Sequence, residues 1–286
     1  MPDASQAEQF RERVRRDWDD PVTIAGWRKW GASSAEMLAG VNRAIVEMAG
    51  ATPGLSILDI ASGAGQPALM LAAAVAPNGS VTATDLSAGM LEVVAENARS
   101  AGLANVRAQQ ADVESLPFPD STFDRVTCRF GAMFFIDPVR GVRECRRVLK
   151  PGGRAVFCVW GPPQQPFFLP AAILRKFVDI PEPPPGAPHI FRYAAPGSLS
   201  DVLCQAGFSQ VREEARRIPC ERAGTPETGW EEFRDMAAPF RPLIAGLPPG
   251  RRAELDTAVL AALGQFSSGG RMKLHVEVNL VTGTRL

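Results

Sequence analysis

The stretch ILDIASGAGQPALMLA, residues 57–72, decides the fold of this 286-residue chain. Its first four residues form a short apolar run, typical of a strand buried on both faces. Small residues follow at alternate positions, Ala61, Gly63 and Gly65, and then helix formers over residues 68–72. This order is typical of the first turn of a nucleotide-binding α/β unit. Glycine lets the backbone approach a ligand, and the helix N-terminus offers free N–H donors.

Asp85 stands twenty residues after Gly65, near the end of the expected strand 81–86. An acidic side chain at that distance fits hydrogen bonding to the hydroxyls of a ribose. The alternative is an ordinary strand–helix turn that holds no ligand. The strand before the turn, the helix after it and the acid together favour the nucleotide site.

Asp59, near the end of the first strand, distinguishes between two kinds of nucleotide. A dinucleotide would bring a pyrophosphate to the turn, where a carboxylate repels it. A carboxylate suits a cationic amino group instead, which favours a ligand with a ribose and an ammonium, such as S-adenosylmethionine. Residues 110–118 follow a third expected strand, and the acid Asp112 with nearby backbone groups suits an adenine amino group.

Four motifs, LDIASGAG, ATDLS, ADVESLPFPDSTFD and RVLKPGG, resemble those of the class I S-adenosylmethionine-dependent methyltransferases. The likeness is greatest to the branch of the ubiquinone/menaquinone biosynthesis methyltransferases (methyltransferase type 11), and it covers about residues 55–160. The resemblance implies an α/β fold with a doubly wound, seven-stranded, Rossmann-like sheet whose last strand is antiparallel. It also implies S-adenosylmethionine as the methyl donor and S-adenosylhomocysteine as the product.

The same resemblance assigns residues to each part of the cofactor. The methionine part falls to Asp59, Ala61, Gly63, Gly65 and Gln66, and the ribose hydroxyls to Asp85. The adenine falls to Leu86 and Met90 on its faces and to Asp112 and Val113 at its amino edge. The loop after the fourth strand, which passes the cofactor in this family, contains Arg129, Phe130 and Met133. Arg129 is not a residue that the family pattern predicts there.

Composition suits an enzyme that acts on a small molecule. The 31 basic and 31 acidic residues give a formal net charge of zero, so a nucleic-acid partner is not expected. No run of 18 uncharged apolar residues predicts a membrane span, and the charged N-terminal residues lack the apolar core of a secretory signal. The five cysteines form no CxxC pair and no zinc pattern, so no metal is expected and a reducing cytoplasm fits. The sequence does not indicate an oligomeric state.

Three segments organise the chain. Residues 1–52 are expected to form an N-terminal helical cap, 53–160 the cofactor-binding core, and 161–286 the rest of the sheet with mostly helical lid insertions at about 161–197 and 220–270. The core alternates strands near 55–60, 81–86, 106–111, 123–129 and 153–160 with helices near 66–76, 88–101 and 138–148. Strands six and seven are expected at about 208–219 and 273–282, the latter from its period-two alternation.

Candidate acceptor residues lie on both sides of the core. Trp27 and Trp30 precede Ser33 and Glu36, whose capping-box spacing predicts that a helix begins there. The two tryptophans either line the acceptor pocket or pack the N-terminal helices onto the sheet. Phe134 follows the fourth strand, and ligands of open α/β sheets bind beyond the carboxyl ends of strands. Its ring either lines the bottom of the acceptor site or is part of the core.

A general base is hard to assign. Methyl transfer depends mainly on aligning acceptor, methyl and sulfur and on excluding water, although oxygen acceptors often need a base as well. His189 in the expected lid is the candidate catalytic residue, against the alternative of an exposed loop histidine, which the pattern favours. The family often has a histidine after the fourth strand, and residues 134–137 contain none. Methylation of ring carbon, or of an acceptor that ionises by itself, is compatible with that lack.

The sequence thus predicts a cytoplasmic methyltransferase for a small acceptor that is apolar or aromatic, quinone-like or a secondary metabolite. A quinone-biosynthesis C-methyltransferase is the alternative within that class. Two other classes stay open, a catalytically silent protein that binds adenosyl ligands and an NAD-dependent oxidoreductase. Asp59, Pro67 and the turn at 149–153 count against the oxidoreductase.

Overall fold

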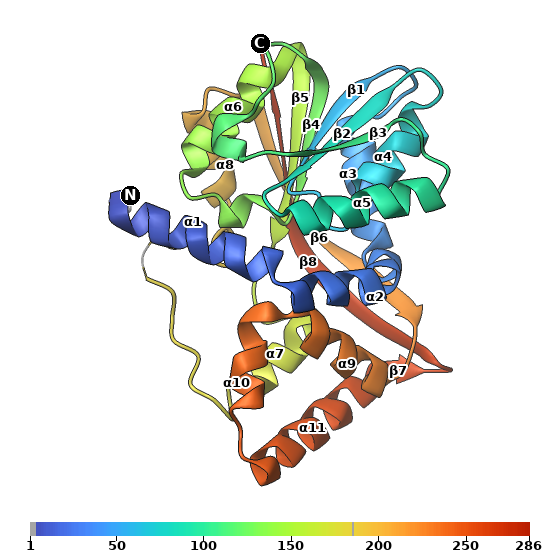
Figure 1. Ribbon diagram of the computed structural model, residues 1–286, viewed down its shortest axis with the longest axis vertical. Coiled ribbons are helices and arrows are strands. Elements are labelled where there is room, and N and C mark those ends of the chain that lie inside the picture. The colour runs from blue at the N-terminus through green and yellow to red at the C-terminus, as the bar shows by residue number, and fades with distance from the viewer. Residues whose placement is uncertain (1–3, 185) are drawn as a thin grey trace.

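One mixed β-sheet runs through the computed structural model, which describes residues 4–184 and 186–286 (Figure 1). Its seven main strands are β1 (Ser56–Ile60), β2 (Ser80–Asp85), β3 (Val106–Gln110), β4 (Phe123–Arg129), β5 (Leu149–Trp160), β6 (Ser209–Ala223) and β8 (Arg271–Thr284). They pair in the order β3-β2-β1-β4-β5-β8-β6, and the short strand β7 (Ser267–Ser268) pairs with β8. β8 is antiparallel to β5 and β6, whereas the other main pairs are parallel. The predicted doubly wound sheet with an antiparallel last strand is confirmed.

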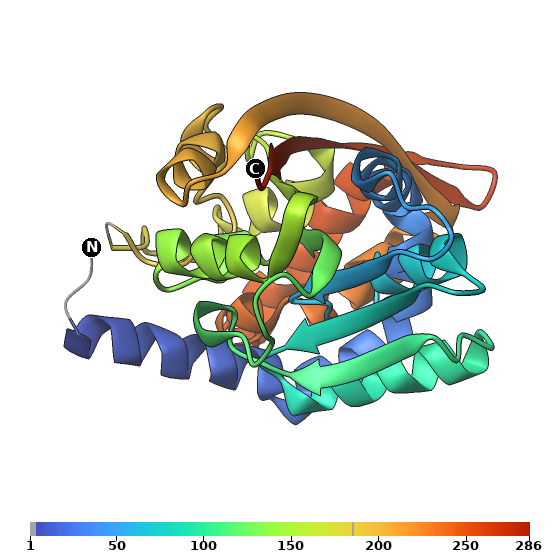
Figure 2. The same cartoon turned by 90° about the horizontal axis from the view of Figure 1, so that it is seen from above.

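Helices cover both faces of this sheet, as the view from above shows (Figure 2). The helices on one face are α3 (Ala39–Ala49), α4 (Ala68–Val75) and α5 (Ala88–Ser100), and those on the other are α6 (Pro138–Val148) and α8 (Ser198–Gln205). Ile57 and Leu58 of β1 point to opposite faces, and both are fully buried. This explains why the first strand is a nearly continuous apolar run rather than an alternating one.

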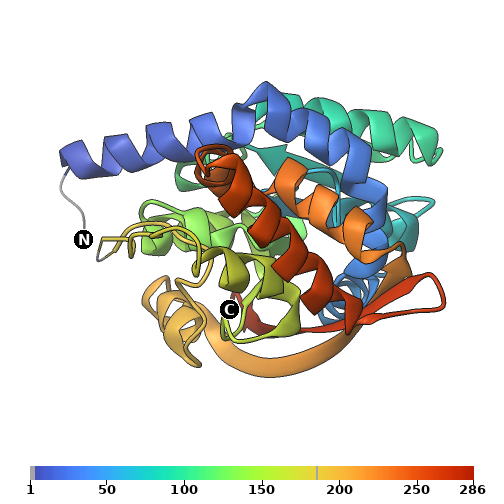
Figure 3. The same cartoon turned by 90° about the horizontal axis from the view of Figure 1, so that it is seen from below.

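The long antiparallel pair of β6 and β8 extends beyond the rest of the sheet (Figure 1). Residues 278–284 of β8 pair with β5, whereas residues 271–277 pair with β6 past the end of β5. A separate group of helices, which we call the cap helices, lies at the end of the molecule to which this pair extends (Figure 1): α7 (Leu169–Leu174), α9 (Pro226–Met236), α10 (Arg241–Ala245) and α11 (Pro249–Gly264). Seen from below, α11 lies beside α7 and α9 (Figure 3).

Two N-terminal helices, α1 (Ala4–Asp19) and α2 (Pro21–Met37), cross the junction between sheet and cap helices, where α2 contacts both α5 and α9 (Figure 1). Asp20 caps α2 by accepting a hydrogen bond from the Thr23 N–H at 3.0 Å. The prediction that a helix begins at Ser33 is therefore wrong. Ser33 lies inside α2, and its hydroxyl bonds Glu232 and Arg222, which are distant in sequence.

The observed bounds refine the other expectations. β5 begins at Leu149 rather than near 153, because the turn at 149–153 pairs with β4 through an irregular register. β6 and β8 are longer at the cap end than the predicted 208–219 and 273–282. Their extra residues pair with each other and not with the central strands.

Candidate cofactor site

The turn after β1 has a left-handed backbone at three positions. The φ angles are 52° at Ala61, 52° at Gly63 and 102° at Gly65. A Cβ added to Gly63 would meet nothing within 4 Å, so this side of the turn is open. A Cβ added to Gly131, after β4, would lie 2.4 Å from the Ala61 Cβ. The loop after β4 therefore packs closely against the turn, and only glycine fits at that contact.

Asp85, at the end of β2, holds the turn in place. Its Oδ2 accepts a hydrogen bond from the Gly63 N–H at 2.9 Å, and its Oδ1 accepts one from the Ser87 N–H at 3.0 Å. Burial raises the pKa of the Asp85 carboxyl, and these backbone bonds oppose that rise. A carboxylate offers about four lone-pair sites. Both oxygens thus keep capacity for a further donor such as a ribose hydroxyl.

Asp59 is a fully buried acid with one unsatisfied oxygen. Its Oδ1 accepts a hydrogen bond from the Thr127 hydroxyl at 2.5 Å, but its Oδ2 has no partner. Burial raises the pKa of this carboxyl to about 6. The buried Oε1 of Gln66 lacks a partner too. Unsatisfied buried acceptors are costly, so these two oxygens fit a ligand that brings N–H donors, as the α-ammonium of S-adenosylmethionine does.

The expected adenine edge is formed by the loop after β3. Asp112 caps the short helix η1 (Val113–Ser115) by accepting a hydrogen bond from the Glu114 N–H at 2.9 Å. Glu114 itself is buried, and its Oε1 accepts hydrogen bonds from the N–H groups of Ile136 and Asp137, both at 2.8 Å. Glu114 therefore ties the loop after β3 to the loop after β4. Sequence reasoning missed Glu114, because its partners lie 22 and 23 residues further along.

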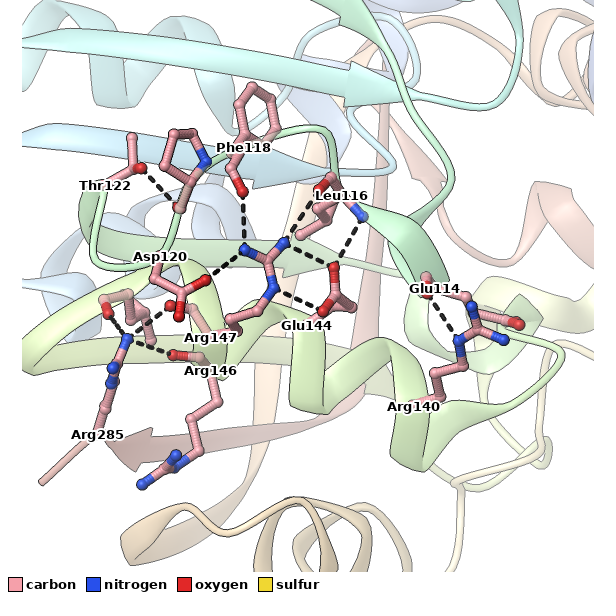
Figure 4. A network of polar contacts seen from close by, with 12 residues as sticks. Glu114, Leu116, Phe118, Asp120, Thr122, Arg140, Glu144, Arg146, Arg147 and Arg285 are labelled. Carbon is pink, nitrogen blue, oxygen red and sulfur yellow. Dashed lines mark hydrogen bonds and ion pairs between the residues drawn. The ribbon is translucent and has the colours of Figure 1, made fainter.

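Side chains of α6 hold the same loop from below (Figure 4). The Arg140 Nε donates to the Glu114 carbonyl oxygen at 2.8 Å, and Glu144 accepts from the Leu116 N–H at 3.0 Å. The Arg147 guanidinium donates to the Leu116 and Phe118 carbonyl oxygens and pairs with Glu144. These bonds tie the loop after β3, which we call the adenine loop for its expected role, to α6.

Helix α1 lies against both loops that are expected to meet the nucleoside. Its Asp19 accepts a hydrogen bond from the Ser87 hydroxyl at 2.8 Å. Its Arg11 lies 3.7 Å from the Asp112 Oδ2 and 3.4 Å from the Glu114 Oε2. Met90 is fully buried where α5 begins, and Leu86 is half-buried before it. The predicted nucleoside residues are therefore gathered at one end of the sheet under α1.

A group of stacked rings, which we call the aromatic wall, begins at Phe130. Phe130 has a left-handed φ of 59° and stacks on Trp160 with ring centroids 3.6 Å apart and planes 7° apart. Trp160 also contacts Phe167 at 5.1 Å and Phe168 at 5.0 Å, and Phe168 contacts Phe191 at 4.8 Å. The wall starts at the carboxyl ends of β4 and β5. Sequence reasoning named Phe130 but missed its partners.

The three predicted acceptor residues do not lie together. Trp18 of α1 joins two of them, with its ring centroid 6.3 Å from that of Trp27 and 5.8 Å from that of Phe134. Trp30 is turned to the cap helices, where its Nε1 donates to the Asp235 Oδ2 at 2.7 Å. The indole Nε1 of Trp27 is buried without a partner. Met133, which precedes Phe134, is fully buried.

His189 makes its hydrogen bond within its own turn, where its Nδ1 accepts from the Phe191 N–H at 3.3 Å. Burial, and then the nearby Arg192 charge, lower the pKa of this imidazole, so it is neutral at pH 7. Arg192 donates to the Phe135 carbonyl oxygen at 2.6 Å and docks the segment on the loop after β4.

Among the described residues, no cluster of three or more His, Cys, Asp or Glu could hold a metal ion. No described helix is long and apolar enough to cross a membrane.

Solved structures share this architecture. YcgJ from Bacillus subtilis matches with a TM-score of 0.56 and 23% identity, over 85% of this chain and 97% of that one. Phosphoethanolamine N-methyltransferase 2 from Haemonchus contortus, solved with S-adenosylhomocysteine, matches with a TM-score of 0.52 and 18% identity, over 86% and 52%. The [4+2]-cyclase SpnF matches with a TM-score of 0.52 and 21% identity, over 86% and 79%. These likenesses define a Rossmann-like methyltransferase fold.

The sequence comparison narrows that class. Residues 58–157 match the family model described as a methyltransferase domain. The ubiquinone/menaquinone biosynthesis C-methyltransferases UbiE of Shewanella sediminis and Shewanella woodyi are each 37% identical over 139 residues, 48% of this chain and 53% of those proteins. The chain thus spans about half the length of the curated relatives that it matches. It carries a class I S-adenosylmethionine-dependent methyltransferase domain.

Proposed function

We propose that this protein transfers the methyl group of S-adenosylmethionine to a small apolar or aromatic acceptor by in-line displacement, with S-adenosylhomocysteine as the product. One observation carries the cofactor part. Buried oxygens of Asp59 and Gln66 lack donors beside the open face of Gly63. A ligand with an α-ammonium would satisfy both, whereas the pyrophosphate of NAD would meet the carboxylate of Asp59.

In this proposal the chain's own residues bind the cofactor and orient the acceptor. When bound, S-adenosylmethionine supplies a methyl group on a sulfonium that is already a strong electrophile. Asp85 would hold the ribose, and the adenine would lie among Leu86, Met90, Asp112 and Val113. Because much of the rate then comes from proximity, the protein needs to align the acceptor and exclude water. Helix α1, which bonds Ser87 and the acids of the adenine loop, supports that exclusion.

The acceptor side of the proposal rests on the aromatic wall. It begins at Phe130, in the loop that we expect to pass the cofactor, and continues through Trp160 into residues 161–197. Trp27 and Phe134, joined by Trp18, give a second aromatic group near the same loop. We therefore assign residues 1–52 and the insertions 161–197 and 220–270 to acceptor binding. Aromatic surfaces of this kind bind rings and alkyl groups rather than charged groups, which favours an apolar or aromatic acceptor.

No general base is evident in this arrangement. His189 is neutral at pH 7 and so able to accept a proton, but its Nδ1 is already bonded within its turn. Methylation of an electron-rich ring carbon, or of an acceptor that ionises by itself, needs no such base.

All five cysteines are free thiols and four are buried, which suits a reducing cytoplasm.

Two other functions have a specific observation behind them. The 37% identity to the UbiE proteins over about half of the chain favours quinone-type ring carbon as the acceptor. The chain also shares its fold with a protein named as a [4+2]-cyclase, so the fold is not confined to proteins named for methyl transfer, and a protein that binds an adenosyl ligand without transferring its methyl group is the second candidate. A quinone-type methyltransferase would methylate a quinol acceptor, whereas the silent binding protein would not.

Calorimetry with S-adenosylmethionine, S-adenosylhomocysteine and NAD tests the proposal. We expect micromolar binding of both adenosyl ligands and a loss of about 100-fold in Asp85→Ala, since each hydrogen bond to a charged group contributes roughly 1.5–3 kcal/mol. Asp201→Ala, which removes an exposed acid of α8, is the matched control and should bind normally. Radiolabelled methyl transfer to phenols and quinols follows. Preference for NAD would overturn the proposal, and tight binding without transfer would favour the silent alternative.

A further inference from the structure

Two buried polar atoms of opposite charge lack partners beside the turn after β1. They are the Oδ2 of Asp59 and the Nε of Arg129. Asp59 pairs in register with Thr127, and the two side chains are hydrogen-bonded. Arg129 lies two residues after Thr127, so it shares the sheet face of Asp59, one step closer to the turn. The two orphaned atoms therefore belong to one corner of the molecule.

The surroundings of Arg129 fix its position without satisfying it. Its Nη1 donates to the Oδ1 of Asn42, a buried residue of α3, at 3.1 Å. Its guanidinium carbon lies 5.5 Å from the centroid of the Phe130 ring. A guanidinium carries five N–H donors, and taking such a charge out of water is costly unless these donors find acceptors. The side chain is thus anchored at one end, with donor capacity left over.

Arg129 and Asp59 do not neutralise each other as an ordinary buried ion pair would. The charge of Arg129 favours the ionised form of Asp59, which shows that the two are electrostatic neighbours. Yet the Oδ2 of Asp59 and the Nε of Arg129 both stay without a partner. A group placed at this corner with one positive and one negative end would satisfy both. The amino-acid end of S-adenosylmethionine carries an ammonium and a carboxylate on the same carbon.

We propose that Asp59 and Arg129 together recognise the amino-acid end of the cofactor, with Asp59 accepting from the α-ammonium and Arg129 donating to the α-carboxylate. This inference rests on the proposed function, and it gives a role to an arginine that the family pattern does not predict. Arg129 is then a specificity residue, since it distinguishes S-adenosylhomocysteine from adenosyl ligands without a carboxylate. Arginine suits this role because its planar fork matches a carboxylate.

The test compares three ligands by calorimetry: S-adenosylhomocysteine, its decarboxylated analogue, and 5′-methylthioadenosine, which lacks the amino-acid end. Arg129→Met keeps the length of the stem and removes the charge. We expect it to weaken S-adenosylhomocysteine about 30-fold and to change the affinity for the other two less than threefold. Arg125→Met, on the same face of β4 and bonded to backbone oxygens, is the matched control and should change none of the three.

The outcomes separate the two proposals. If neither S-adenosylhomocysteine nor 5′-methylthioadenosine binds the wild-type protein, the proposed function fails. If both bind and Arg129→Met weakens them equally or not at all, the role of Arg129 is overturned while the cofactor site stands. If the Arg129→Met variant does not fold, the inference is tested with the wild-type protein alone. Its decarboxylated ligand should bind about 30-fold more weakly than S-adenosylhomocysteine, and equal affinities would refute the inference.

Discussion

On the cofactor side of this molecule, Asp85 holds the turn after β1 by a different kind of contact from those at the junction between α2 and the cap helices, on the cap side. Around the turn after β1, Asp85 bonds Ser87 two residues away and Gly63 22 residues away. Across the junction between α2 and the cap helices, Trp30 bonds Asp235 at a separation of 205 residues, and Arg222 bonds Ser33 at 189. The first set fastens backbone N–H groups, and the second joins side chains of distant segments.

This contrast implies that the two sides vary independently. Backbone N–H groups are present whatever the side chains are, so the cofactor turn depends on few residues. The cap depends on many pairwise matches, each of which can change with its partner. A methyltransferase domain can then keep one cofactor while its cap adapts to different acceptors. If the two sides are separable, a substitution on one side leaves the other unchanged.

The largest effect is expected from Arg222→Met. Arg222 is buried, pairs with Glu232 of α9, and bonds Ser33 of α2. Burial raises the pKa of the Glu232 carboxyl, so without its partner this acid is a costly buried charge. Breaking such a pair costs about 3–5 kcal/mol. We expect urea denaturation to show that loss in the cap, while the affinity for S-adenosylhomocysteine changes less than threefold.

A double variant, Arg222→Met with Glu232→Leu, is the control. Replacing a buried ion pair by apolar groups is often neutral or stabilising, so most of the lost stability should return. If Arg222→Met instead weakens cofactor binding in proportion to the loss of stability, the two sides are coupled and the comparison fails.

The same contrast explains what could be predicted from the sequence. The strand, turn and helix around residues 57–72 could be predicted, and Asp59 and Asp85 proposed for the site, because strand, turn, helix and acid lie within thirty residues of each other. The parallel core of the sheet followed for the same reason, since local alternation of strands and helices leaves few topologies, whereas the antiparallel last strand was expected from the family resemblance. Ser33 was misread as a cap because its true partners, Arg222 and Glu232, come from the other end of the chain.

The aromatic wall shows the same limit. Trp160 ends a predicted core strand, and nothing local indicates that it stacks on Phe130. Glu114 likewise stands in a polar run that reads as a solvated loop. Its burial depends on N–H groups of Ile136 and Asp137, which only the folded chain brings to it.

A smaller loss of stability is expected from Gly26→Ala. A Cβ at this position of α2 would lie 2.7 Å from the backbone oxygen of Asp235 in α9. Overpacking of this kind costs about 1–3 kcal/mol, because one helix must shift away from the other. Thermal unfolding should report the loss. Gly31→Ala, in the same helix, meets the Ala64 Cβ at an ordinary 3.6 Å and should be neutral or stabilising. Equal losses in both variants would contradict close α2–α9 packing.

The cofactor side should respond to pH through Asp59, whose pKa is about 6. Because this pKa lies above the unfolded value, the contribution of Asp59 to the stability of the free protein is present below about pH 4 and lost as the pH rises through 6. Binding of an ammonium needs the ionised acid and runs in the opposite direction. The affinity for S-adenosylhomocysteine should therefore fall about tenfold from pH 7 to pH 5. The Asp59→Asn variant should bind S-adenosylhomocysteine weakly, and its affinity should depend less on pH. If the affinity of this variant depends on pH as that of the wild-type protein does, the role of Asp59 is refuted.

The smallest effect is expected where α1 meets the adenine loop. Arg11 lies near Asp112 and Glu114, with its own side chain a quarter exposed, and such partly exposed pairs contribute roughly 0.2–1 kcal/mol. Arg11→Met should therefore loosen α1 and raise the dissociation rate of S-adenosylhomocysteine about two- to threefold, measured by stopped-flow displacement. Arg15→Met removes an exposed arginine from the same helix and controls for the change in charge. If both variants release the ligand equally fast, the field of α1 and not the contact with the adenine loop is responsible, and α1 would not act as a closure over the nucleoside.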